Sequence, residues 1–265
     1  MLGEPLADPY TQYPDLVTPG RRSMTTSHNH QGLFLVLEGA DGSGKSAVAT
    51  ELVTLGRDAG LDIRRVLRGS PRGDEAHASL IRTVGRLFAE SDEIGARWDL
   101  LSLAAATQCL ALLQTEVEDS VLAGGVVIAE SWWHKTQVRL AIEASICGYL
   151  DPSQELAFST WQQGLMPSST KLSQAQQMTV LIETDLDTRV KWYEAGGCVD
   201  PVYDPQGVVT HDPIHFGNFT ERIAIGLRQR AQEEGWPTIR NGMERRPVEL
   251  ARELIELILT RHTIE

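Results

Sequence analysis

Cysteine is scarce in this chain: its 265 residues include only three, Cys109, Cys147 and Cys198. An odd, small number without metal-type spacing excludes a disulfide framework and is typical of a reducing compartment. No apolar run reaches membrane-spanning length, because the longest uncharged run, residues 100–115, is interrupted by polar residues and predicts a buried helix. The N-terminus also lacks the basic-then-apolar pattern of a signal peptide. These absences predict a cytoplasmic protein that does not enter the membrane.

The chain has fewer positive than negative residues: it contains 24 basic and 36 acidic residues, which gives a net charge of −12. An acidic chain lacks the broad electrostatic footprint that duplex nucleic acid requires. The basic residues nevertheless cluster in one stretch, at Arg57, Arg64, Arg65, Arg68, Arg72, Arg82 and Arg86. A local basic patch suits a small, highly charged ligand. The alternative, which must apply to several of these arginines, is a solvated helix face.

The chain divides into a short tail and one long globular segment. Residues 1–31 contain four prolines and little apolar periodicity, and predict a disordered tail, or an extension ahead of a true start at Met24. Residues 32–265 are long enough for one α/β domain with a substantial core. The hydrophobic fraction of 42% is ordinary for a soluble globular protein.

Strand and helix patterns alternate along the globular segment. Strands are predicted over residues 33–37, 61–67, 126–129 and 178–183, and helices over residues 47–56, 74–89, 99–122, 187–195, 216–234 and from Pro247. Within residues 99–122, apolar residues at three- and four-residue spacing predict one buried face: Leu103, Ala106, Leu110, Leu113, Val117 and Val121. The alternation predicts a parallel sheet covered by helices on both faces, with ligands bound at the carboxyl ends of its strands.

A glycine-rich octet follows the first predicted strand directly, and consists of Gly39, Ala40, Asp41, Gly42, Ser43, Gly44, Lys45 and Ser46. It matches GxxxxGK[ST], and the strand before it and the helix after it, from Ala47, supply the context that the motif requires. The glycines let backbone N–H groups cradle phosphate oxygens, Lys45 offers a charge to the β and γ phosphates, and Ser46 offers a hydroxyl to Mg²⁺. Residues 39–47 therefore predict a nucleoside triphosphate site, with ATP as the ligand; the alternative is a glycine-rich turn that binds nothing.

The string FLVLEGADGSGKS resembles the opening of the thymidylate kinase family, an apolar strand followed by Glu-Gly-x-Asp-Gly-x-Gly-Lys-Ser. A generic phosphate loop requires neither Glu38 nor Asp41. The resemblance implies a P-loop kinase with three layers, and places Asp41 near the magnesium and the sugar hydroxyl of the acceptor. For Glu38 the alternative is a strand-end carboxylate that caps backbone amides.

A second carboxylate, Glu130, ends the strand at residues 126–129. Phosphoryl transfer needs a group there to hold the magnesium shell or to orient the acceptor. The thymidylate kinase family has Asp-Arg-Tyr at this point and the related deoxyribonucleoside kinases have Glu-Arg-Ser, whereas this chain has Glu130-Ser131-Trp132. The resemblance thus implies a catalytic or metal-shell role for Glu130, with a solvated acid as the alternative, and the arginine of both families is missing.

Other departures from the family fall at the acceptor site and the lid. After its second strand the family has an arginine that reaches the acceptor phosphate; Arg68 matches it, and Arg72 is an extra candidate. The long helix lacks the family's stacking Phe and its Asp-Arg pair, which puts thymine in doubt and leaves stacking to Trp98, Trp132 or Trp133.

The lid is predicted around residues 191–221, as a long loop over residues 196–215 without Lys or Arg. Transition-state charge is then expected from the flanking Arg189, Lys191 and Arg222.

Taken together, these features predict a nucleotide kinase that moves the γ-phosphoryl group of ATP to a nucleoside monophosphate with Mg²⁺ as cofactor. The residues expected to carry catalysis are Lys45, Glu130, Asp41 and Arg68. Three alternatives stay open: a deoxynucleoside kinase, a kinase of a modified base in DNA, and a non-catalytic nucleotide-binding regulatory module. The acceptor base, the sugar and the oligomeric state are undetermined, and a homodimer is one of the alternatives.

Overall fold

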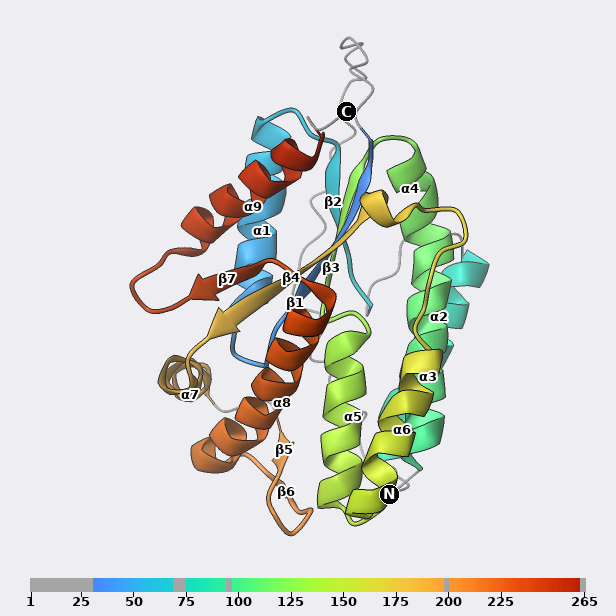
Figure 1. The fold of residues 1–265 in the computed structure, drawn as a ribbon, viewed down its shortest axis with the longest axis vertical. Coiled ribbons are helices and arrows are strands. Elements are labelled where there is room, and N and C mark those ends of the chain that lie inside the picture. The colour runs from blue at the N-terminus through green and yellow to red at the C-terminus, as the bar shows by residue number, and fades with distance from the viewer. Residues whose placement is uncertain (1–30, 69–74, 94–96, 198–200, 263–265) are drawn as a thin grey trace, which may run out of the picture. The chain divides into compact units, whose positions relative to one another are not determined.

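The computed structural model describes residues 31–68, 75–93, 97–197 and 201–262 (Figure 1). The tail predicted over residues 1–31 lies outside this part of the chain except for Gln31, and so does the candidate Arg72. The regular elements that position the site all fall within the described ranges.

A five-stranded parallel sheet forms the centre of the fold, with strand order β2-β3-β1-β4-β7. Its strands are β1 (Leu33–Glu38), β2 (Ile63–Val66), β3 (Val126–Glu130), β4 (Gln177–Thr184) and β7 (Thr238–Asn241). The helical elements are α1 (Lys45–Asp58), α2 (Glu75–Glu93), α3 (Trp98–Leu112), a π-helical turn (Leu113–Val117), α4 (Glu118–Leu122), α5 (His134–Ile146), α6 (Pro152–Gly164), a 3₁₀ turn (Gln174–Gln176), α7 (Leu186–Ala195), α8 (Pro213–Glu234) and α9 (Pro247–His262). The predicted parallel α/β sheet is confirmed, and β7 is a strand that the sequence analysis missed.

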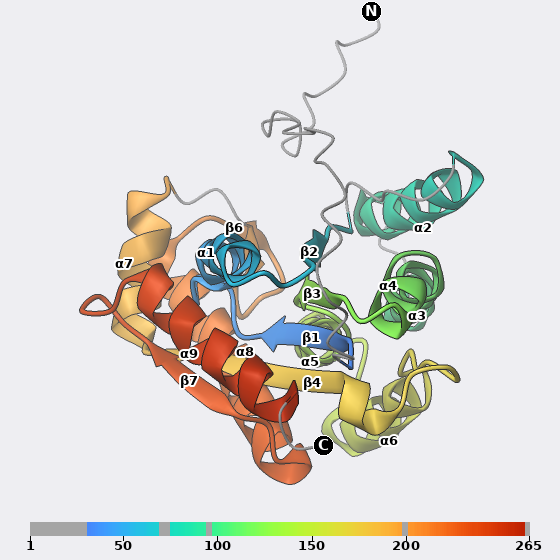
Figure 2. The same cartoon turned by 90° about the horizontal axis from the view of Figure 1, so that it is seen from above.

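The two faces of the sheet are covered by different helices, as the alternating side chains of β1 demonstrate. Leu33, Leu35 and Leu37 pack with α1 and α9 on one face. Phe34 and Val36 pack on the other face with the long helix that begins as α3, and α8 contacts β4 there. Figure 2 shows α1 and α9 on one side of the sheet, and α3 and α4 on the other. Strands buried on both faces explain the near-continuous Val, Ile and Leu of the central strands.

The predicted buried face of the long helix is only partly correct. The prediction is confirmed for the buried residues Ala106, Leu113, Val117 and Val121. It is wrong for Leu103 and Leu110, which are 45% and 38% exposed, whereas Leu101 and Cys109 are buried. Eleven of the fifteen residues of α3 are apolar, so spacing alone could not fix which side faces the core. The π-helical turn also alters the repeat between α3 and α4. In the described chain, Trp98–Leu122 is the one helix long and apolar enough to cross a membrane, and 61% of its most apolar window is buried, as in a core helix.

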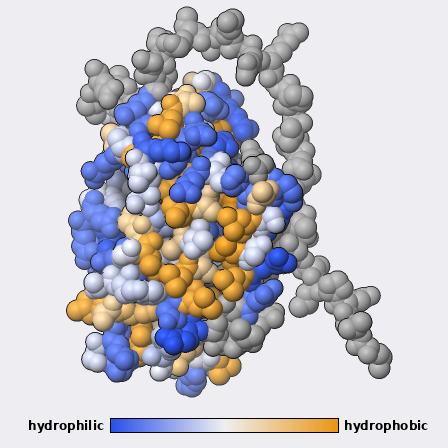
Figure 3. All heavy atoms as spheres, turned by 90° about the vertical axis from the view of Figure 1, so that its right-hand side faces the viewer, coloured by the Kyte–Doolittle hydropathy of each residue, from blue (hydrophilic) through white to orange (hydrophobic). Residues whose placement is uncertain are grey.

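Exposed apolar side chains gather on one outer face of the molecule. Figure 3 shows hydrophobic residues in the middle of the face that α2, α3 and α6 form. The large exposed ones on these helices are Leu80, Leu87, Leu100, Leu103, Leu110, Leu156 and Trp161. Contiguous exposed apolar surface is typical of contact sites between proteins. The homodimer that the sequence left open stays a prediction.

The predicted lid is not the structureless loop that the sequence suggested. Two short strands, β5 (Val202–Tyr203) and β6 (Val209–Thr210), pair as an antiparallel hairpin, and Val202 is buried against α8. The Asp204 carboxylate accepts hydrogen bonds from the backbone N–H groups of Gln206 and Val208, which closes the turn. The signal was present, since Asp-Pro-Gln-Gly lies between two short runs of Val, Tyr and Thr. Residues 198–200 of the lid lie outside the described chain.

Candidate nucleotide-binding site

The glycine-rich loop lies at the carboxyl ends of the sheet, between β1 and α1, and neighbouring strands hold it in place. Gly42 and Gly44 have φ angles of 75° and 80°, in the left-handed region that favours glycine. A Cβ atom on Gly44 would lie 2.5 Å from Nδ2 of Asn241. That same amide, at the end of β7, donates to the carbonyl oxygen of Ser43 at 2.9 Å, and the Thr184 hydroxyl at the end of β4 donates to it at 3.2 Å. The loop is therefore preorganised by contacts that the motif alone does not reveal.

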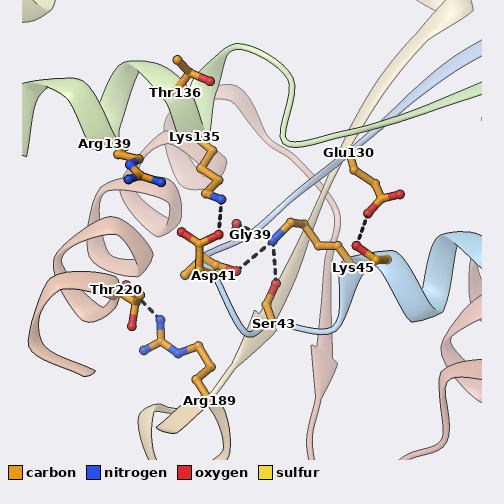
Figure 4. Close-up of polar contacts among 12 residues, drawn as sticks. Gly39, Asp41, Ser43, Lys45, Glu130, Lys135, Thr136, Arg139, Arg189 and Thr220 are labelled. Atoms are coloured by element: carbon orange, nitrogen blue, oxygen red, sulfur yellow. Dashed lines mark hydrogen bonds and ion pairs between the residues drawn. The ribbon is translucent and has the colours of Figure 1, made fainter. Parts of the chain in front are cut away.

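Lys45 is buried and its ammonium lies across its own loop (Figure 4). Nζ donates to the carbonyl oxygens of Gly39 and Ala40, both at 2.8 Å, and to Oγ of Ser43 at 3.1 Å. Burial and the neighbouring Lys135 ammonium lower the pKa of Lys45 to about 8. The predicted phosphate-binding lysine therefore points into the loop, where phosphate oxygens would compete for its donors.

Ser46 and Glu130, the two residues expected to bind Mg²⁺, are brought together from the start of α1 and the end of β3. Ser46 Oγ donates to Glu130 Oε2 at 2.6 Å. The other carboxylate oxygen pairs with Arg65 from β2. Hydroxyl and carboxylate oxygens are ligands that suit Mg²⁺, which usually takes one or two carboxylates together with substrate phosphates. The described residues contain no group of three or more His, Cys, Asp or Glu that could hold a metal ion by themselves. The pair thus fits a magnesium ion that is shared with a nucleotide.

Asp41 faces α5 and forms an ion pair with Lys135 in the first turn of that helix (Figure 4). Burial alone would raise the pKa of Asp41, but the nearby cations of Lys135 and Arg139 hold it well below its ordinary value. The sequence analysis did not single out Lys135. The position of Lys135 in the sequence could have indicated it, because the first turn of a helix that follows a parallel strand lies at the ligand-binding edge of the sheet.

Glu38 ends β1 as a fully buried carboxylate. Neither of its oxygens accepts a well-formed hydrogen bond in the described chain. The backbone N–H of Lys135 interacts with the carboxylate, so the amide cap stays an alternative. Burial raises the pKa of Glu38 from its ordinary 4.5 to about 7, although the charges of Lys45 and Arg68 oppose the rise. A buried acid that titrates near neutrality beside a phosphate loop is a functional candidate.

Arg68 reaches the same edge of the sheet, but its donors are used within the protein. Its guanidinium donates to the backbone carbonyl of Trp132, to Sγ of Cys109 at 3.2 Å and to Oγ1 of Thr136 at 3.3 Å. It also lies 5.8 Å from the centre of the Trp132 ring. Arg68 therefore links the end of β2 to α3 and to the start of α5.

The buried tryptophans belong to the core. Trp133 is fully buried, and Trp132 packs edge-on against Phe34 of β1. Trp98 stacks on Tyr149 at 6.1 Å. The suggestion that Trp132 or Trp133 stacks on an acceptor base does not fit these packed positions.

Arg189, expected to supply charge to the transition state, is turned away from the loop. Its guanidinium is fully buried and donates to the carbonyl oxygen of Thr220 at 2.9 Å (Figure 4). It also forms an ion pair with Glu221. Lys191 and Arg222 are exposed. Arg189 is therefore paired with Glu221 in this arrangement, and its contribution to the transition state stays a prediction.

Comparison with known proteins gives a partial similarity. No family model matches the chain. A thymidylate kinase from Ruegeria pomeroyi is 36% identical over 107 residues, a match that covers 40% of this chain and 48% of that protein. The chain thus spans about half the length of this curated relative. The similarity is distant and partial, and at this level it supports a nucleotide kinase without specifying the acceptor.

Proposed function

We propose that this protein is an ATP-dependent kinase that phosphorylates a nucleoside monophosphate, in the manner of thymidylate kinases. The observation that carries the proposal is the contact between residues at or after the carboxyl ends of two adjacent strands, β1 and β3. β1 leads into the phosphate loop, and β3 delivers Glu130 to within 2.6 Å of the Ser46 hydroxyl. A phosphate cradle with a hydroxyl and a carboxylate beside it is the donor site of phosphoryl transfer.

The residues of this chain would act mainly by positioning and charge. The loop amides and Lys45 would bind the β and γ phosphates, with Lys45 exchanging its carbonyl partners for phosphate oxygens. Ser46 and Glu130 would hold Mg²⁺, which supplies neutralisation of the phosphate charge when bound. Arg65, paired with Glu130, keeps that carboxylate oriented toward Ser46. Aligned reactants and fixed charges then lower the barrier without covalent chemistry by the protein.

One observation favours a second candidate, a nucleoside kinase. A nucleoside hydroxyl must lose a proton as it attacks phosphorus, whereas the phosphate of a monophosphate is already anionic. Glu38 offers a suitable base, since it is a buried carboxylate with a pKa of about 7 at the end of β1. A monophosphate kinase has no need of that base.

The test is release of ADP from ATP and Mg²⁺ with separate panels of nucleosides, nucleoside monophosphates and oligonucleotides. The proposal expects turnover that requires a monophosphate and disappears in Lys45→Ala. Turnover with nucleosides alone would replace it with the second candidate. ATP binding without turnover on any acceptor would make the protein a non-catalytic nucleotide-binding module.

A further inference from the structure

Two cations lie one helical turn apart on α5 and face the phosphate loop. Lys135 pairs with Asp41 of the loop, and Arg139 is close enough to act electrostatically on the same carboxylate. Residues four apart on a helix lie on one face, so both side chains project toward the same region. Figure 4 shows them on α5 above Asp41 and Lys45.

Lys135 retains capacity for a ligand. Its side chain is only 12% exposed, and a buried ammonium requires anionic partners. Among the described residues its Nζ donates to Asp41, and the Glu38 carboxylate also lies close enough to interact with its charge. An ammonium has three donors, so oxygen atoms that approach from the loop side could accept from the other two.

Arg139 is held in place from two sides. Its Nε donates to the Glu143 carboxylate at 2.6 Å, and its guanidinium lies 5.8 Å from the centre of the Phe219 ring of α8. These contacts fix the stem while the side chain remains 36% exposed. A guanidinium can bind phosphate through two parallel hydrogen bonds.

The start of α5 adds to the attraction for an anion. The N-cap residue Trp133 makes no side-chain hydrogen bond to the first turn of this helix. The helix dipole favours negative charge nearby, and the Glu38 carboxylate already interacts with the backbone N–H of Lys135 there. The rival cation is Arg68, whose guanidinium is occupied by the Trp132 carbonyl, Cys109 and Thr136.

We infer that Lys135 and Arg139 form the subsite for the phosphate of the acceptor, and that Asp41 holds Lys135 over the loop. This inference rests on the proposed monophosphate kinase activity. The dianionic phosphate of a monophosphate would compete with Asp41 and Glu143 for the donors of Lys135 and Arg139. The closeness of Lys135 to Lys45 would place that phosphate beside the γ-phosphoryl group of ATP. A nucleoside would gain nothing from the pair.

The test compares Lys135→Met and Arg139→Met with wild type, using thymidine monophosphate or whichever nucleoside monophosphate wild type phosphorylates fastest. The matched control is Arg252→Met, which removes an exposed cation from α9. Each α5 variant should raise the KM for the monophosphate about tenfold or more, as loss of a charge-assisted hydrogen bond predicts. The KM for ATP should change less than twofold, and Lys135→Arg should recover most of the loss.

Each outcome bears on one claim. If wild type phosphorylates a monophosphate and both α5 variants keep its KM, the subsite is overturned while the proposed function stands. Equal loss in the KM for ATP would overturn it too, because the residues would then serve the donor or the fold. If wild type phosphorylates no monophosphate, the proposed function and the subsite both fail. Should Lys135→Met not fold, Arg139→Met and Lys135→Arg still decide the question.

Discussion

Glu38→Gln should stabilise the protein at alkaline pH and not at acid pH. The wild-type carboxylate is fully buried, and neither oxygen accepts a well-formed hydrogen bond in the described chain. Glutamine keeps the size of the side chain and removes the charge. Any cost of burying its amide is the same at every pH, so the pH dependence of the difference isolates the charge.

The magnitude follows from the pKa of Glu38, which burial raises from 4.5 to about 7. The folded value lies above the unfolded one, so the native state binds this proton more tightly. Its contribution to stability is complete below about pH 4.5 and is lost as the pH rises to about 7. At about 1.36 kcal/mol for each pKa unit, the loss is about 3 kcal/mol, an upper bound for the gain in Glu38→Gln.

The assay is thermal unfolding of wild type and Glu38→Gln between pH 5 and pH 8 at fixed ionic strength. Even a third of that energy, about 1 kcal/mol, would raise the Tm of the variant by about 2–4 °C at pH 8. The matched control is Glu256→Gln, an exposed glutamate on α9. A difference in Tm that is the same at pH 5 and pH 8 would refute the reasoning, because the pKa of Glu38 would then be the same in the folded and unfolded states.

Three further predictions test other parts of the chain. Lys45→Ala should reduce phosphoryl transfer at least about a hundredfold while the fold stays intact, which turnover assays and circular dichroism would check. If this variant turned over at the wild-type rate, the loop would not be the donor site. A chain that begins at Met24 should melt at the same temperature as the full chain, and a fall of several degrees would mean that the first residues are docked. Arg68→Ala should lower the Tm by about 2–4 °C or more through loss of its hydrogen bond to the Trp132 carbonyl, and should impair nucleosides and monophosphates alike. A loss confined to monophosphates would instead place Arg68 in the acceptor site.

The strand, loop and helix of the candidate donor site could be predicted because their signal is local. The phosphate loop needs one strand, one glycine-rich turn and one helix, all contiguous in the chain, and residues 33–58 supply them in order. Glu130 could be added since its strand also ends at the carboxyl edge of the sheet. The edge strand β7 was not predicted because it has only four residues, and two of them, Thr238 and Arg240, are exposed and polar.

The acceptor side stays a prediction, because it depends on where long side chains point. Arg68 and Arg189 lie at positions that the sequence favoured, yet both guanidinium groups turn to backbone carbonyls of neighbouring elements. Lys135 was overlooked since it matches no motif, and its relation to Asp41 spans 94 residues. Position along the chain fixes a Cα atom, while a flexible cationic stem can reach several partners from it.

The π-helical turn at residues 113–117 contains one residue more than the same length of regular α-helix would need. Bonds from i to i+5 enclose one residue more than the i to i+4 bonds of an α-helix, so the turn stores an extra position between α3 and α4. Loss of one residue there could be absorbed by reverting to regular α-helix, which would leave the core contacts of Cys109 and Val121 in phase. The same deletion within α3 would rotate every later side chain by about 100°. We therefore expect deletion of one residue to be tolerated within this π-helical turn and not within α3.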